Sequence, residues 1–195
     1  MAIEFKKDTV AGRVPAIWRG ECKMLPAGFA LNTPVSIGKV VLRGTPVKVN
    51  VMNHTCDICK TASVLNGGTT TAPRINKGSL FEVGDKITKV GGAVATINKI
   101  DASNADYDVL TLSTAISGLA SGDVLAETDA TAGEAKFEPN AVVGYDFESK
   151  ANSVQILDCA YEAVVLEPSL DSPILPAWKN GFTMKANPNI LFIAQ

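Results

Sequence analysis

The chain has 195 residues, 46% hydrophobic and 19% charged, with a formal net charge of −2. These values exclude a disordered protein and leave room for one large domain or two small ones. We expect no membrane partner, because no run approaches the ~18 consecutive apolar residues of a spanning helix. The segment MAIEFKKDTV lacks the apolar stretch of a secretory signal, so synthesis in the cytoplasm is expected.

Charge is divided unevenly along the sequence. Residues 1–100 carry fourteen Lys or Arg and six Asp or Glu, a balance of +8, whereas residues 101–195 carry four and fourteen, a balance of −10. This division indicates a basic arm for an acidic partner, head-to-tail packing of copies, or a fold that interleaves the two halves. No nucleic-acid partner is expected, because the cations are dispersed, aromatic residues make up 6% and the pI is near 5.4.

Residues 1–35 are predicted to be an N-terminal extension, because they show little periodicity and contain three prolines. Such a segment, with scattered large apolar residues, packs either on a neighbouring molecule or over the core of its own chain. The first β-strand pair is predicted within residues 36–50, with strands at 39–43 and 47–50. Pro46 is expected at the start or edge of its strand, where no backbone N–H is needed.

A further strand is predicted from Cys56 to Leu65, and the polar run at 69–73 is predicted to be an exposed loop. The following region, residues 78–128, has short apolar runs broken by Gly, Asn, Asp and Ser, which is typical of a small β-barrel. Two Gly-Asp turns, Gly84-Asp85 and Gly122-Asp123, each lead into a predicted strand. Gly suits such turns because it tolerates positive φ, and Asp because it bonds nearby backbone.

Proline distribution divides the chain into domains, since residues 74–138 contain none. The predicted fold is all-β: a β-sandwich or barrel-like domain of residues 36–77 and 129–195, interrupted by the inserted small β-barrel of residues 78–128. The apolar run at 189–193 is expected to be a strand in the core or a strand added to another subunit.

His54, Cys56 and Cys59 are the only candidate metal ligands. Cys-x-x-Cys with a nearby His could supply three ligands for zinc, but a zinc site normally needs a second pair, and Cys22 and Cys159 are isolated. Because the region is also a predicted strand, alternation would place Cys56 and Cys59 on opposite faces. We therefore favour four reduced thiols and no metal or other cofactor.

No catalytic residues are predicted. His54 is the sole histidine, so any Ser/His/Asp or Cys/His mechanism must use it. A carboxylate pair for glycoside hydrolysis remains open, although Asp in such turns is first a turn residue. The candidate carboxylates are Asp101, Asp106, Asp108 and Asp123. The calcium-like spacing of residues 101–106 lacks the Gly and distal Glu of an EF-hand.

Four segments carry a shared turn-and-strand pattern. They are VVLRGTPVKV at 40–49, CDICKTASVLNG at 56–67, FEVGDKITKVGGAVATINKIDASNADYDVLTLSTAI at 81–116 and SGDVLAE at 121–127. The combination resembles capsid-associated proteins of tailed bacteriophages, specifically the head fibre and head decoration group. The resemblance covers residues 36–145, and these are structural patterns without a catalytic signature.

The resemblance implies a non-enzymatic structural protein of the virion, on the phage head, that binds the major capsid protein. It also implies a homo-oligomer, with a trimer favoured. Such a protein is synthesised in the host cytoplasm and ends in the virion, and a prophage-encoded copy would be cytoplasmic. The alternatives are a carbohydrate- or cell-surface-binding β module and, third, a β-fold hydrolase that uses paired Asp residues.

Overall fold

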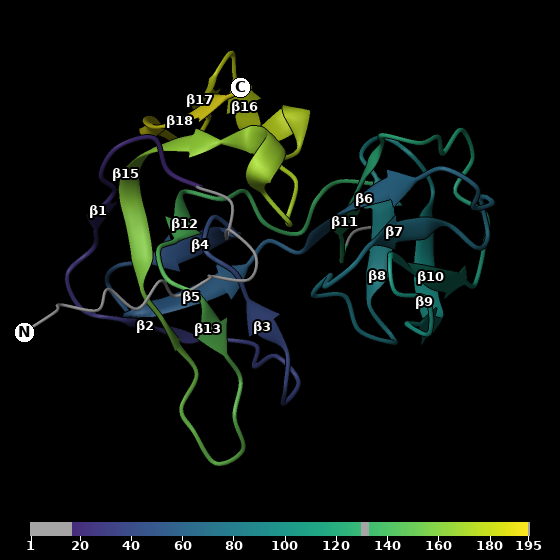
Figure 1. Cartoon of the computed structure of the whole chain (residues 1–195), viewed down its shortest axis with the longest axis horizontal. Coiled ribbons are helices and arrows are strands. Elements are labelled where there is room, and N and C mark those ends of the chain that lie inside the picture. The colour runs from purple at the N-terminus through teal and green to yellow at the C-terminus, as the bar shows by residue number, and fades with distance from the viewer. Residues whose placement is uncertain (1–16, 130–132, 195) are drawn as a thin grey trace, which may run out of the picture.

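The computed structural model describes residues 17–129 and 133–194. These residues form an all-β fold, as predicted, which divides into two parts (Figure 1). We call residues 17–60 and 133–194 the main domain, and residues 61–127 the barrel. Among the described residues, no helix is both long enough and apolar enough to cross a membrane.

One long sheet forms the framework of the main domain. In spatial order it contains β14 (Ile156–Leu157), β2 (Phe29–Leu31), β5 (Thr55–Ile58), β4 (Pro46–Asn50), β12 (Ala141–Val143), β15 (Cys159–Leu166), β18 (Asn187–Ile193), β17 (Thr183–Met184) and β16 (Lys179–Asn180). Off this path, β1 (Lys23–Met24) pairs with β15, and β3 (Val40–Val41) pairs with β13 (Phe147–Glu148). Two short 3₁₀ helices, η1 (Glu167–Ser169) and η2 (Pro176–Trp178), follow β15. Pro46 begins β4, as predicted.

Apolar side chains cover both faces of this sheet at β12. Val142 packs in one buried cluster with Trp178 and Ile190, whereas Val143 packs in another with Phe29. Successive residues of a strand point to opposite faces, which explains why every residue of β12 is buried. The uninterrupted apolar sequence of β12 is therefore the signature of a strand covered on both sides.

The C-terminal run is a core strand of its own chain. β18 pairs in parallel with β15, and the side chains of Ile190 and Phe192 are buried in the main domain. This confirms the first of the two expectations for this segment. Its apolar residues are covered within the chain and do not require a second subunit.

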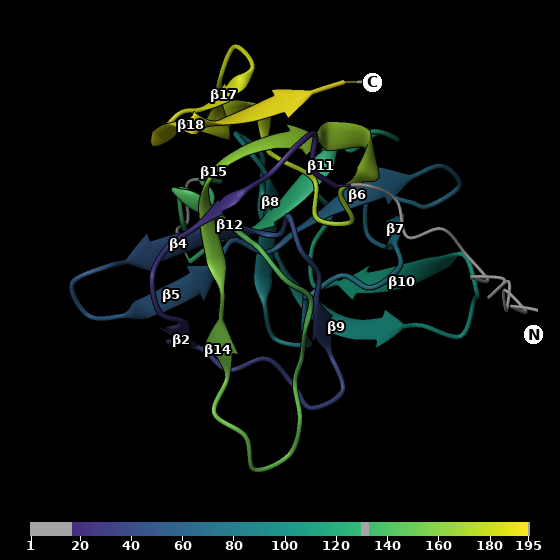
Figure 2. The same ribbon diagram turned by 60° about the vertical axis from the view of Figure 1, so that its left-hand side comes forward.

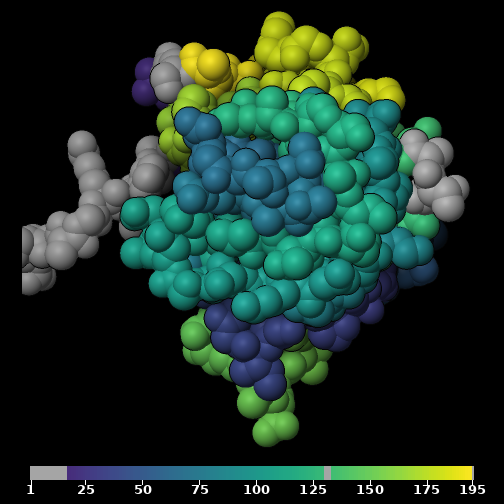
Figure 3. Space-filling view, turned by 90° about the vertical axis from the view of Figure 1, so that its right-hand side faces the viewer, coloured from purple at the N-terminus to yellow at the C-terminus, as the bar shows by residue number. Residues whose placement is uncertain are grey.

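Within the described residues, six strands close the barrel. Their order around it is β10 (Tyr107–Leu112), β7 (Arg74–Asn76), β6 (Thr61–Leu65), β11 (Val124–Glu127), β8 (Lys86–Lys89) and β9 (Val94–Asp101). Alternate residues point inward and fill the interior, among them Val64, Ile75, Ile87, Ile97, Leu110 and Leu125. The barrel interior is thus a packed core and not a ligand channel. When the molecule is viewed from the side on which the barrel lies, the barrel covers much of the main domain (Figure 3).

The predicted start of the barrel at residue 78 is wrong. β6 and β7 precede that residue, yet they pair with β11 and β10 and complete the ring. The strand predicted from Cys56 to Leu65 is in fact two strands, β5 in the main domain and β6 in the barrel, with Cys59 and Lys60 between them. The closed barrel needs β6 and β7, because without these two strands β10 and β11 would each have one edge without a partner strand.

The described part of the N-terminal extension belongs to the main domain. β1 pairs with β15, Trp18 forms a bridge with Val165, and β2 pairs with β5. Residues 17–31 therefore cover the core of their own chain, and residues 1–16 of the predicted extension lie outside the described residues. The separate boundary at residue 35 is wrong for this part, since strands of two and three residues need tertiary partners and leave little pattern in the sequence.

The uneven charge along the sequence is interleaved by the fold. Basic β4 from the first half lies beside β12 from the second half. Ion pairs also join the halves, with Lys23 Nζ 2.8 Å from Glu162 Oε1 and Arg43 Nε 3.3 Å from Asp146 Oδ1. The sequence asymmetry therefore does not by itself indicate a basic arm or an acidic partner.

Candidate interaction groove

The two Gly-Asp turns form two corners of the barrel, which we call the first corner (Glu82–Asp85) and the second corner (Ala120–Asp123). Gly84 has a φ of +98° and Gly122 a φ of +89°, so a side chain at either position would strain the backbone. The first corner leads into β8 and the second into β11, as the sequence predicted.

The hydrogen bonds of the two corners match one for one. Asp85 Oδ2 accepts a bond of 2.9 Å from the N–H of Glu82, and Asp123 Oδ2 accepts one of 2.7 Å from the N–H of Ala120. The N–H of Gly84 donates to the carbonyl of Ile97 on β9, and the N–H of Gly122 donates to the carbonyl of Val64 on β6. Because β8 and β11 are antiparallel neighbours, the corners are related by an approximate two-fold axis.

The main domain fills the space beside the first corner. The N–H of Ser36 donates to Glu82 Oε1 at 3.0 Å, and Lys39 Nζ donates to the carbonyls of Ser79 and Phe81 at 2.7 and 3.3 Å. Burial lowers the pKa of Lys39, partly offset by the charge of Glu82.

The first corner also takes part in an ion-pair network at the point where the chain enters and leaves the barrel. Lys60 Nζ lies 2.8 Å from Asp85 Oδ2 and 3.8 Å from Glu127 Oε2, and Lys136 Nζ lies 2.7 Å from Glu127 Oε1. The cavity that remains beside Lys60 and Glu127 measures only about 20 Å³. The surface at the first corner is therefore occupied by protein from the same chain.

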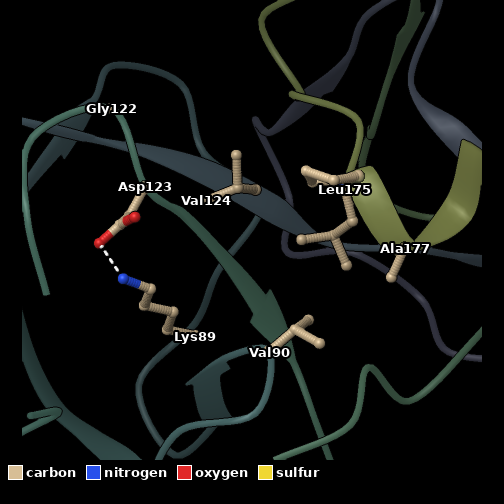
Figure 4. Close-up of a pocket in the computed structure, with 8 residues that line it drawn as sticks. Lys89, Val90, Gly122, Asp123, Val124, Leu175 and Ala177 are labelled. Atoms are coloured by element: carbon tan, nitrogen blue, oxygen red, sulfur yellow. Dashed lines mark hydrogen bonds and ion pairs between the residues drawn. The ribbon is translucent and has the colours of Figure 1, made fainter. Parts of the chain in front are cut away.

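The second corner is open by contrast. A cavity of about 340 Å³ lies between the barrel and the segment that contains η2. Val90 and Val124 of the barrel face Leu175 and Ala177 of the main domain across it, with Lys89 and Asp123 at one end (Figure 4). We call this cavity the seam groove.

A neighbouring cavity extends the seam groove along the boundary of the two parts. It measures about 320 Å³, shares Val90 and Ala177 with the seam groove, and reaches Phe137 and Trp178. Its rim also carries Lys185, whose Nζ lies 3.4 Å from Glu138 Oε1. The combined surface has an apolar floor and charges near its ends.

The polar groups at the end of the seam groove already have partners. Lys89 Nζ lies 2.7 Å from Asp123 Oδ2 and donates to the carbonyl of Gly118 at 3.0 Å. Burial alone would raise the pKa of Asp123, but hydrogen bonds from Lys89 and the Ala120 N–H outweigh it and lower the pKa. A carboxylate held ionised in this way is poorly suited to act as a general acid.

The other aspartates do not form an acid–base pair with Asp123. Asp108 is buried beside Lys77, whose Nζ lies 2.6 Å away, and Asp101 accepts a hydrogen bond from the N–H of Ser103. Hydrogen bonds from the side chain and the N–H of Ser103 lower the pKa of Asp101. Asp106 closes the same loop through a bond from its N–H to Asn104 Oδ1. These side chains build turns and ion pairs on the barrel surface.

The three candidate metal ligands lie apart. His54 is exposed, has a φ of +50°, and stacks on Phe29 with 5.9 Å between ring centroids. Cys56 packs in the core cluster of Phe29, whereas Cys59 packs in the cluster of Trp178, on the other side of the sheet. The predicted placement of the two thiols on opposite faces is confirmed. In residues 17–129 and 133–194, no three His, Cys, Asp or Glu side chains gather as a metal site.

Two of the three buried thiols, those of Cys59 and Cys159, are held in their neutral form. Burial raises the pKa of the Cys59 thiol, and a hydrogen bond with Cys56 together with burial raises that of Cys159. A metal ligand or nucleophile must be the thiolate, so both cysteines behave as small core residues.

Comparison with known proteins identifies no relative. The chain matches no protein-family model, no curated protein and no solved structure. The geometry of the chain itself therefore has to support any functional proposal.

The seam groove was not predicted from the sequence. It is made by residues 89–90, 122–124 and 175–177, which come together only through the docking of η2 on the barrel. The Gly-Asp repeat does predict that the barrel has two similar corners. Nothing in the sequence indicates that one corner is covered and the other is open.

Proposed function

We propose that the chain is a structural protein of a tailed-phage virion, a head fibre or head decoration protein. In this proposal it binds the major capsid protein and forms a homo-oligomer, with a trimer favoured. The motif resemblance over residues 36–145 suggests this function, and one feature of the molecular surface supports it.

That feature is the uneven distribution of exposed apolar side chains. Of the ten large apolar side chains that are exposed among the described residues, eight lie in the main domain and only Val83 and Val90 lie in the barrel. Val90 moreover lines the seam groove. Exposed apolar surface of this kind marks contacts with other proteins, so we assign assembly to the main domain and to its boundary with the barrel, and solvent exposure to the rest of the barrel.

One end of the main domain offers a preformed surface for the capsid. Two loops, residues 35–39 and 149–155, project there side by side (Figures 1 and 2). Gln155 braces them, because its side chain bonds both backbone groups of Val35 at 2.8 Å and Ser149 Oγ at 2.6 Å. Ile37 in the first loop and Val154 in the second are 72% and 76% exposed. Rigid loops lose little entropy on binding, which favours a contact with a folded protein.

The experiment is co-sedimentation of the purified protein with capsid shells of the phage or prophage that encodes it. Wild type should bind with a saturable stoichiometry, and the double variant Ile37→Asp/Val154→Asp should bind at least tenfold more weakly, about 1.4 kcal/mol, because charge is placed in an apolar contact.

Phe182→Asp is the matched control, since Phe182 is 63% exposed and follows β16, at the other end of the main domain from the two loops (Figure 1). Its binding should equal that of wild type. Absence of wild-type binding at micromolar concentration would refute the proposal. Equal loss in the control and in the double variant would move the capsid contact away from the two loops.

A further inference from the structure

We propose that the seam groove receives the β4–β5 turn, residues Val51 and Met52, of a second copy of this chain. The inference builds on the oligomerisation in the proposed function and names the contact that produces it. It rests on two features that fit one another, an open corner of the barrel and an exposed apolar turn.

The open corner is one of two equivalent corners. At the first corner, the main domain contacts the barrel through the Ser36 N–H on Glu82 Oε1 and through Lys60 on Asp85, whereas a cavity of about 340 Å³ lies beside the second corner. The barrel surface at such a corner thus demonstrably accepts a segment of folded protein. The vacant corner has more than twice the volume of a ~150 Å³ cavity that holds benzene, and so has room for two aliphatic side chains.

The occupant of the second corner has to be apolar and neutral. Lys60 of the main domain bonds Asp85 of the first corner, whereas at the second corner Lys89 of the barrel itself bonds Asp123 and the carbonyl of Gly118. The two charged side chains at this end of the cavity are therefore already paired with one another. What remains for an occupant is contact with Val90, Val124 and Leu175, which only apolar side chains satisfy.

The β4–β5 turn has these properties. Met52 is 90% exposed, the highest value among the large apolar side chains described, and Val51 beside it is 55% exposed. Residues 49–53 carry no charged side chain. The turn is also preformed, because the N–H of Asn53 bonds Asn50 Oδ1 at 3.2 Å. A preformed apolar turn should bind in an apolar groove more tightly than a flexible turn of the same sequence, because it loses less conformational entropy on binding.

The two surfaces meet between copies and not within one. The β4–β5 turn lies on the side of the main domain away from the barrel (Figures 1 and 2), whereas the seam groove adjoins the barrel. The contact is therefore heterologous, one copy supplying the turn and the next supplying the groove. Such contacts close into a ring when the rotation between copies permits, or otherwise extend as a filament.

Site-directed cross-linking of mixed variants tests the pairing. In a Cys22→Ser background, Met52→Cys protein and Ala177→Cys protein are mixed and treated with a short bismaleimide. The remaining native cysteines are buried. We expect a covalent dimer that contains one copy of each variant, and at least tenfold less product when Val83→Cys replaces Ala177→Cys. Dimers formed equally well by Met52→Cys alone, or no excess over the control, would overturn the proposal.

Sedimentation velocity gives a second readout that needs no cross-linker. Met52→Asp and Val90→Asp, one on each side of the contact, should each weaken self-association at least tenfold, while Val154→Asp should associate as wild type. A strictly monomeric wild type, or wild-type association in both contact variants, would overturn the inference. Capsid co-sedimentation is measured separately, so a monomer that binds capsids would refute this contact and the proposed homo-oligomer, and would leave the proposed binding to the major capsid protein standing.

Discussion

The barrel and the main domain are both all-β, but they are assembled differently. The barrel uses one continuous stretch of chain, residues 61–127, and encloses a single core. The main domain joins two stretches that are far apart in sequence, as in the pairing of Val47 with Ala141, and has a cluster on each face of its sheet. The fold of the barrel therefore depends on contacts within one stretch of chain, whereas the fold of the main domain depends on contacts between segments that are far apart in sequence.

The difference extends to the surfaces. A closed barrel has no edge strands, while the main sheet ends in β14 and β16, each of two residues. Most exposed large apolar side chains among the described residues also lie on the main domain. An insert with its own core, carried on a domain that exposes more large apolar side chains, fits the proposal that one part assembles and the other is displayed.

The largest expected effect comes from matched core substitutions in the two parts. Leu125 in the barrel and Leu157 in the main domain are both fully buried, and Leu→Ala at either should cost about 2–5 kcal/mol. Both tryptophans, Trp18 and Trp178, lie in the main domain, so tryptophan fluorescence follows that domain while far-UV circular dichroism follows both.

In urea, Leu125→Ala should therefore shift part of the dichroism transition and leave the fluorescence midpoint in place. Unfolding the barrel leaves a closed loop in a folded main domain, and the cost of closing a loop rises only slowly with its length. Leu157→Ala should shift the fluorescence midpoint. If Leu125→Ala moved both probes together, the two parts would be one cooperative unit and the comparison would fail.

The next effect concerns the ion pairs that join the parts. The side chains of Lys60, Asp85 and Glu127 are only 10%, 17% and 11% exposed. Lys60→Met therefore leaves Asp85 without its cation, while Glu127 keeps Lys136. We expect a loss of about 2 kcal/mol, below the range for fully buried pairs because some solvent contact remains. Denaturation by urea measures it. Lys23→Met, which breaks an exposed pair with Glu162, is the control and should change stability by less than about 1 kcal/mol.

The sequence predicted those features of the fold that depend on local chemistry. The turns at Gly84-Asp85 and Gly122-Asp123, the start of β4 at Pro46 and the opposite faces of Cys56 and Cys59 all follow from backbone geometry or strand alternation. Each of these was found as predicted. Local rules suffice where a residue type is required by φ or by the pleat.

The boundary of the barrel could not be found in the same way. Residues 56–65 form one nearly continuous β-favourable run, and nothing local marks Cys59 and Lys60 as the point where the chain leaves the main domain. Only the pairing of β6 with β11 reveals it. The seam groove could not be predicted for a related reason. It lies between residues that are more than fifty positions apart in the sequence, such as Val124 and Leu175.

The smallest effect tests the two equivalent corners against one another. Asp123→Asn keeps the shape of the side chain but removes the charge that Lys89 and the Ala120 N–H contact, and should cost about 1 kcal/mol at pH 7. Asp85→Asn should cost more, because its partner Lys60 is more deeply buried than Lys89. Urea midpoints at pH 7 compare the two, and equal losses would show that the covering of the first corner adds nothing.

The pH dependence of Asp123→Asn provides a separate check on the second corner. Because the pKa of Asp123 is lowered in the folded protein, its ionised form contributes stability above the pKa of the unfolded chain, about 3.9. That contribution is lost as the pH falls from there through the folded pKa. The stability difference between wild type and Asp123→Asn should therefore be constant from pH 7 to about pH 5 and shrink below about pH 4. A difference that stayed the same at pH 3 would show that the substitution acts through packing and not through the charge beside the seam groove.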